Sequence, residues 1–150
     1  MSGRERKPDK IEILFDSELF DIEAEPPNDI NPIRGQAFLA WLAPRLGAAG
    51  YRVDGPHTED WGWYVEVHAP SGRYTVGASA LPFRGAVVDW TLQVTRARSI
   101  RERLRGEGQI GLADPLVRWI EACVREQVQP SELVVEALDA RGRHLPEDQG

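Results

Sequence analysis

The segment from His57 to His68 contains a cluster of side chains that bind metal ions or exchange protons, namely His57, Glu59, Asp60 and His68. Imidazole and carboxylate groups are common zinc ligands, but this spacing matches no recognised zinc or iron pattern. We therefore expect no metal site. An enzyme that uses the His57, Asp60 and His68 region is the third of three functional hypotheses. Its alternative is that Glu59 and Asp60 form a polar turn.

A basic segment runs from Arg96 to Arg105, where five arginines accompany a single carboxylate, Glu102. Helical spacing places three of the guanidinium groups on one side, those of Arg98, Arg101 and Arg105. Ile100 and Leu104 are expected to anchor the other side. Because gathered guanidinium groups suit phosphate or carboxylate recognition, the second hypothesis is an anion or nucleic-acid binder. The alternative is a solvated face, and no aromatic residue is interleaved with these arginines to stack on bases.

Negative charge is concentrated near the start of the chain. Between Ile11 and Ile33 there is no basic residue, and there are seven carboxylates, those of Glu12, Asp16, Glu18, Asp21, Glu23, Glu25 and Asp29. Such a strip complements a basic protein partner, or it guards an exposed strand edge against self-association. We take five of these residues as candidates for partner binding: Asp16, Glu18, Asp21, Glu23 and Glu25.

The sequence contains no pattern typical of nucleophilic catalysis or of nucleotide binding. Cys123 falls on the apolar stripe of a predicted helix, where a thiol is inert. Gly106, Gly108 and Gly111 follow a predicted helix, whereas a phosphate-binding loop links a strand to a helix. We expect no cofactor, and the sequence favours a protein that is not an enzyme.

The 150 residues suit one domain, expected at residues 11–138 with flexible tails at 1–10 and 139–150. A net charge of −6 argues against broad binding to nucleic acid or to anionic membranes. The lone cysteine and the lack of a long apolar run predict a cytoplasmic protein with no membrane partner.

Alternating apolar and polar residues predict most of the strands. The alternation at residues 11–16 and 20–25 indicates an edge strand interrupted near Ser17, or two short strands. Further strands are predicted at residues 51–53, 61–68, 74–80 and 88–94, and short turns between the long ones indicate an antiparallel meander. Val134 and Val135 favour a final strand within 133–138.

Capping residues locate the helices. A first helix is predicted to start between Asn31 and Gly35, to bend at Pro44 and to end at Gly50. Ser99 and Glu102 match a capping box that opens a short helix over residues 100–105. Asp114 and Pro115 open another helix. Its buried stripe is predicted to contain Leu116, Ile120, Cys123 and Val124.

Three tryptophans mark the predicted core. Trp61 and Trp63 share one face of the strand at 61–68, and Trp90 lies on a neighbouring strand. Such rings could line a slot for a planar ligand, but large aromatic residues at this spacing are typical of a core. We predict that all three rings are buried.

Together these elements predict an α+β fold, in which an antiparallel meander of about four to six strands carries two main helices on one face. Four segments resemble a group of small bacterial proteins of unknown function: Glu59-Asp60-Trp61-Gly62-Trp63, Tyr74-Thr75-Val76-Gly77-Ala78, Arg98-Ser99-Ile100 and Asp114-Pro115. The resemblance covers roughly residues 35–138. It implies a bacterial α+β domain and assigns no functional residue.

The first hypothesis is a small protein-interaction module that binds another protein in the manner of an immunity or inhibitor protein. It is based on the acidic strip and on the missing catalytic pattern. The immunity or inhibitor part is an analogy between folds. The sequence leaves the partner and the oligomeric state open.

Overall fold

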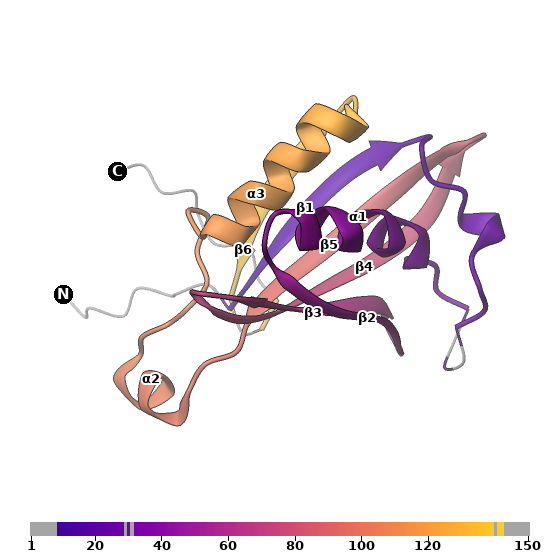
Figure 1. The fold of residues 1–150 in the computed structure, drawn as a ribbon. Coiled ribbons are helices and arrows are strands. Elements are labelled where there is room, and N and C mark those ends of the chain that lie inside the picture. The colour runs from indigo at the N-terminus through magenta and orange to yellow at the C-terminus, as the bar shows by residue number, and fades with distance from the viewer. Residues whose placement is uncertain (1–8, 29, 31, 140, 143–150) are drawn as a thin grey trace.

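A computed structural model describes residues 9–28, 30, 32–139 and 141–142 (Figure 1). The strands are β1 (Lys10–Ser17), β2 (Arg52–Glu59), β3 (Gly62–Ala69), β4 (Gly72–Arg84), β5 (Val87–Arg96) and β6 (Leu133–Leu138). The helices are α1 (Gln36–Ala48), α2 (Ile100–Arg105) and α3 (Pro115–Cys123), with a 3-10 turn η1 (Ile22–Ala24) and a π-helical turn η2 (Val124–Val128). Most of the two predicted tails lies outside the described residues, at 1–8, 140 and 143–150.

All six strands form one open antiparallel sheet in the order β2-β3-β4-β5-β1-β6. The predicted α+β fold is therefore confirmed, and residues 133–138 are a strand. The predicted edge position of the first strand is wrong, because β1 lies between β5 and β6. Hydrophobic alternation determines which face of a strand is buried, but it carries no information about the strand's neighbours.

Residues 20–25 do not form the predicted strand. Phe20 and Ile22 are buried, but the chain turns here through η1. The carboxylate of Asp21 accepts a hydrogen bond from the backbone N–H of Glu23 at 3.0 Å and so starts the turn. A short polar side chain that bonds its own backbone competes with strand pairing, which explains the difference.

The predicted short strand at 51–53 is the beginning of a longer one, because β2 continues to Glu59 and pairs with β3. The register shifts between Asp54 and His57, where a bulge accommodates Gly55 and Pro56. Glycine and proline are typical strand breakers, so their presence concealed this strand in the sequence. The hairpin turns at Asp60 and Trp61, and β3 starts at Gly62.

The core lies between the sheet and the helices α1 and α3, which cover the same face. Trp63 and Trp90 are buried there as predicted, with exposed fractions of 7% and 1%. Trp61 is not. It lies in the hairpin turn with 37% of its surface exposed, and its ring covers Gly77 on the opposite face of the sheet. The alternation of a strand does not determine the side to which a preceding turn residue points, and this explains why the prediction for Trp61 is wrong.

Helix α1 begins after Gly35 and is continuous through Pro44. It ends in a Schellman motif, since the N–H of Tyr51 bonds the carbonyl of Leu46 and Gly50 has a φ of 100°. The predicted glycine cap is thus confirmed, whereas the bend at Pro44 stays a prediction. None of the helices in the described part of the chain has the length and apolar character needed to span a bilayer.

The predicted caps of the other two helices are confirmed. Ser99 and Glu102 form the complete capping box of α2, and the carboxylate of Asp114 accepts the N–H of Leu116 at 2.8 Å at the start of α3. The predicted anchoring of α2 is wrong: Ile100 and Leu104 are 78% and 83% exposed. This short helix lies apart from the sheet (Figure 1), and none of its residues is buried.

Candidate partner-binding groove

The sheet face opposite α1 and α3 contains a groove of about 620 Å³ where β1, β4, β5 and β6 lie side by side. We call it the outer groove. The apolar residues on this face that line it are Leu14, Leu81, Phe83 and Val134. Its carboxylates are those of Asp16, Asp89 and Glu132.

Strand register explains why these side chains meet. Asp89 pairs with Leu81 on one side and with Asp16 on the other, and in the next outward-facing row Leu14 pairs with Val134. Directly paired residues of antiparallel strands point to the same face. One row of the groove therefore contains Leu81 and two carboxylates, and in the neighbouring row Leu14 and Val134 lie beside Thr91.

The apolar part of the outer groove is open to solvent. Leu81 is 72% exposed, Phe83 64% and Val134 48%. The guanidinium carbon of Arg84 lies 5.8 Å from the centroid of the Phe83 ring. Large apolar side chains that gather on a surface beside charged groups are typical of interaction sites.

The lining of the outer groove includes three carboxylates and, among the described residues, no lysine or arginine, while the guanidinium group of Arg84 lies at its edge beside Phe83. Asp16 accepts hydrogen bonds from the Ser131 hydroxyl at 2.5 Å and from the backbone N–H of Glu132 at 2.9 Å. These bonds, that of Ser131 first, hold the pKa of Asp16 below its ordinary value. Asp16 is therefore a fixed negative charge at neutral pH.

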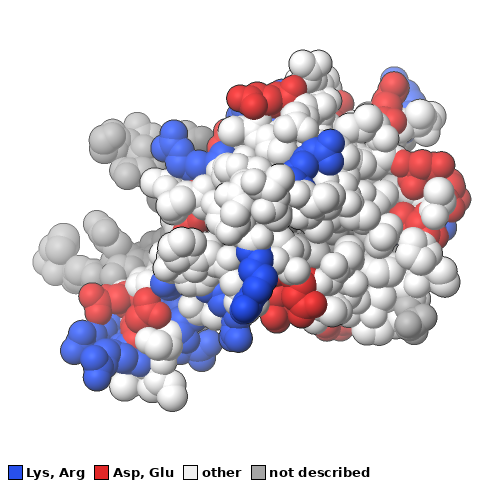
Figure 2. Space-filling view, in the orientation of Figure 1, with Lys and Arg blue, Asp and Glu red and all other residues white. Residues whose placement is uncertain are grey.

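Three of the other predicted residues line a second hollow, of about 330 Å³, on the opposite side of the β4–β5 hairpin tip. Glu18, Asp21 and Glu23 lie there together with Leu19 and Pro82. Figure 2 shows acidic side chains gathered at this end of the molecule. The hairpin tip thus has carboxylates on both sides.

Glu25 is buried, unlike the other four predicted carboxylates. It is 8% exposed, and its carboxylate accepts the backbone N–H groups of Gly35 and Ala37, each at 2.9 Å. These are donors that the first turn of α1 leaves without an intrahelical partner. The carboxylate is occupied as a helix cap, so Glu25 is left out of the candidate site.

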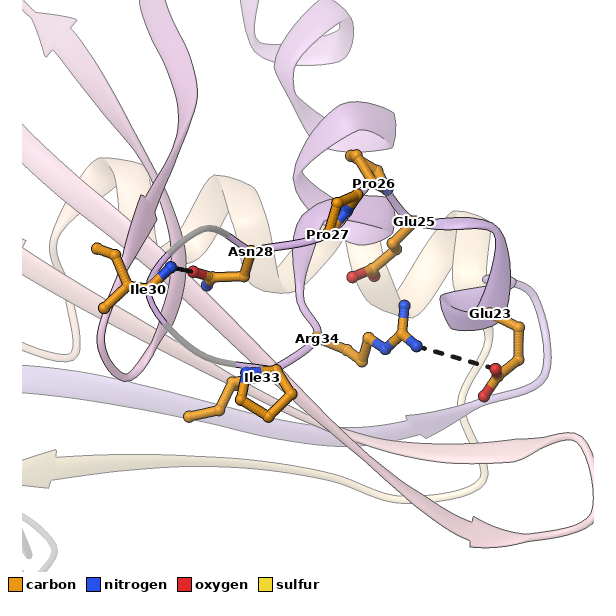
Figure 3. Close-up of a pocket in the computed structure, with 9 residues that line it drawn as sticks. Glu23, Glu25, Pro26, Pro27, Asn28, Ile30, Ile33 and Arg34 are labelled. Atoms are coloured by element: carbon orange, nitrogen blue, oxygen red, sulfur yellow. Dashed lines mark hydrogen bonds and ion pairs between the residues drawn. The ribbon is translucent and has the colours of Figure 1, made fainter.

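Figure 3 shows the hollow of about 550 Å³ that lies beside Glu25, in the loop leading to α1. Its polar side chains bond the loop and its neighbours: Arg34 lies 3.9 Å from Glu23 and donates to the carbonyl of Ile22. Asn28 donates to the carbonyls of Glu59 and Gly62 in the β2–β3 hairpin. These contacts hold the loop in place. Asp29, the seventh predicted carboxylate, lies outside the described residues.

The predicted basic residues are separated by the structure. Arg98 donates to the carbonyl of Glu107 and lines a polar hollow of about 510 Å³ beside α2, together with Arg73, Arg96 and Arg103. Arg101 and Arg105 are exposed on α2 and do not line that hollow. Glu66 and Asp9 also line it, so its positive charge is partly balanced.

The residues of the third hypothesis are spread along the β2–β3 hairpin. His57 pairs with Tyr64, and its Nε2 atom lies 3.5 Å from the carboxylate of Asp54. His68 is four residues beyond Tyr64, roughly 13 Å along the strand. Within the described residues, no three His, Cys, Asp or Glu side chains form a group that could hold a metal ion. Burial raises the pKa of the Cys123 thiol, which disfavours the nucleophilic thiolate.

Sequence reasoning missed most of the outer groove, namely Leu81, Phe83, Asp89, Glu132 and Val134. A signal was present in β4, where the outward positions before Leu81 and Phe83 are polar residues and one glycine. Apolar residues at positions that alternation assigns to solvent indicate a contact surface. The comparisons of the chain with family models, with curated proteins and with solved structures found no match.

Proposed function

We propose that this protein is a protein-interaction module that binds a basic partner segment in the outer groove. The observation that carries the proposal is the combination of Leu81 and Phe83, which are largely exposed, with Asp16 and Asp89 in the same groove. A surface with an apolar centre and one sign of charge around it resembles the core and rim of a protein interface.

Charge and shape determine the class of partner. Burying Leu81, Phe83 and Val134 requires apolar side chains on the partner, and the three groove carboxylates attract lysine or arginine beside them. An acidic partner would be repelled. The ligand is therefore a segment in which aliphatic or aromatic residues alternate with basic ones, and Glu18, Asp21 and Glu23 on the other side of the hairpin tip steer its approach.

The test uses a panel of short synthetic peptides and the full chain. One set combines basic and aliphatic residues, a second combines acidic and aliphatic residues, and a third combines basic residues with serine. We expect binding of the first set alone, with an affinity that falls as salt rises because the ion pairs are screened. The double variant Leu81→Ser/Phe83→Ser should lose this binding at least tenfold.

Leu112→Ser is the matched control, since Leu112 is also exposed, at 39%, and lies outside the outer groove. This variant should bind like the parent. Equal binding of the basic and the acidic peptide sets, or undiminished binding by the Leu81→Ser/Phe83→Ser variant, would contradict the proposal.

Anion binding is the second candidate function, carried by the hollow that Arg73, Arg98 and Arg103 line. Arg96 is largely committed to the fold, because it bonds the carbonyls of Ser71 and Gly108 and the carboxylate of Glu102. The others are positioned to bind phosphate oxygens. Binding of a short oligonucleotide that weakens with salt and disappears in Arg73→Gln/Arg103→Gln would support this function, and no binding at low salt would dismiss it.

A further inference from the structure

Helix α2 has the composition of a docking element. Ile100 and Leu104 are separated by one helical turn and lie on the same side of the helix, and both are almost fully exposed. Arg101, Arg103 and Arg105 are exposed around them. Two aliphatic residues one turn apart, flanked by arginines, are what an apolar groove with an acidic rim recognises in a helix.

The helix is held in one conformation although it buries no residue of its own. Ser99 and Glu102 cap its start, and Gly106 ends it in the left-handed conformation with a φ of 65°. Glu102 also pairs with Arg96 at 3.2 Å, which fixes the helix to the end of β5. A preformed helix loses little conformational entropy when it binds, so exposing it prepares the molecule for a partner.

The outer groove has the complementary chemistry and lies at the other end of the molecule. Asp89 is near the start of β5, whereas α2 follows its end. Seven residue steps of β5, from Asp89 to Arg96, separate the two by roughly 23 Å along the strand, so α2 cannot enter the groove of its own chain. Figure 2 shows basic side chains gathered over α2, with acidic ones among them.

We propose that α2 of one copy of this chain docks in the outer groove of a second copy. The inference rests on the proposed function and names a partner for that groove. Ile100 and Leu104 contact Leu81, Phe83 and Val134, while Arg101 and Arg105 lie beside Asp16, Asp89 and Glu132. The two surfaces are different, so the contact is head-to-tail and leaves a free helix at one end and a free groove at the other.

A head-to-tail contact predicts a specific result when two different variants are mixed. The helix variant, Ile100→Ser/Leu104→Ser, removes the apolar contacts of α2 and leaves the outer groove intact. The groove variant, Leu81→Ser/Phe83→Ser, removes the apolar contacts of the outer groove and leaves α2 intact. In sedimentation velocity the average mass of the parent should rise with concentration, while each variant alone stays monomeric. An equimolar mixture of the two variants should form a one-to-one dimer that does not grow further, because each molecule has one working surface.

Two charge variants refine the test. Arg101→Glu/Arg105→Glu should abolish self-association, whereas the conservative Arg101→Lys/Arg105→Lys should retain it and weaken with salt. A parent that stays monomeric at every concentration overturns the inference, and so does a helix variant that associates like the parent or a mixture that forms no dimer.

The peptide panel separates this inference from the proposed function. The helix variant keeps the outer groove and should bind the basic aliphatic peptides like the parent. If it binds them but forms no dimer with the groove variant, self-association fails and the proposed function stands. If the groove variant retains peptide binding, the proposed function is contradicted, whatever the result for self-association.

Discussion

The carboxylate of Glu25 caps helix α1 by accepting the backbone N–H of Gly35 at 2.9 Å, from ten residues earlier in the chain. Both groups are buried. Because the capped N–H groups have no intrahelical partner, Glu25→Ala should lower the free energy of unfolding by about 1–2 kcal/mol. Glu18→Ala, a change of an exposed carboxylate in the same acidic strip, should leave it nearly unchanged. Urea denaturation of both variants checks this, and equal stabilities would contradict the capping role.

Two tryptophans of the same segment should respond differently to truncation. Trp63→Ala removes a ring that is 7% exposed in the core, and we expect a loss of ~3–5 kcal/mol. Trp61→Ala uncovers Gly77 on the open face of the sheet and should cost less than half as much. Thermal unfolding compares the two variants. A Trp63→Ala protein that melts like the parent would place this ring on the surface.

Tyr74 joins the β3–β4 turn to helix α3. Its hydroxyl donates to the carboxylate of Asp114 at 2.8 Å and lies 2.7 Å from the Ser71 hydroxyl, and burial raises its pKa. Tyr74→Phe should cost about 0.5–1.5 kcal/mol. Asp114→Ala also removes the cap of α3, so a double-mutant cycle is needed. The cycle should give a coupling free energy above about 0.5 kcal/mol, and strictly additive effects would mean that the bond contributes nothing.

Asp16 should make stability depend on pH. Its pKa is lowered in the folded protein by the Ser131 hydroxyl and the Glu132 N–H, so the folded state binds fewer protons than the unfolded state at acidic pH. The stabilisation that Asp16 contributes is fully present above its pKa in the unfolded chain, near 3.8. It is lost as the pH falls through the lowered pKa of Asp16 in the folded protein.

Asp16→Asn measures this contribution. The stability difference between parent and variant should shift in favour of the parent as the pH rises from strongly acid to neutral. A difference that stays constant with pH would show that Asp16 titrates alike in both states.

Local patterns predicted the ends of several elements correctly. The capping box of Ser99 and Glu102, the Asp114 cap and the turn at Gly50 all act between residues that are close in sequence, so the chain alone specifies them. Local patterns failed where a short polar side chain or a strand breaker altered the course of the chain, as at Asp21 and Gly55.

By itself the sequence determined the α+β class and the buried faces of the strands, including Ile13, Trp63 and Trp90. Alternation suffices for this, because side chains of a strand point to opposite faces in turn. Only the tertiary structure decided which strands are neighbours, and so brought Asp16 beside Asp89 in one groove. It also decided that Glu25 caps a helix while Glu18 stays exposed. Carboxylates in one acidic strip look alike in sequence, and what separates them is contact with residues distant along the chain.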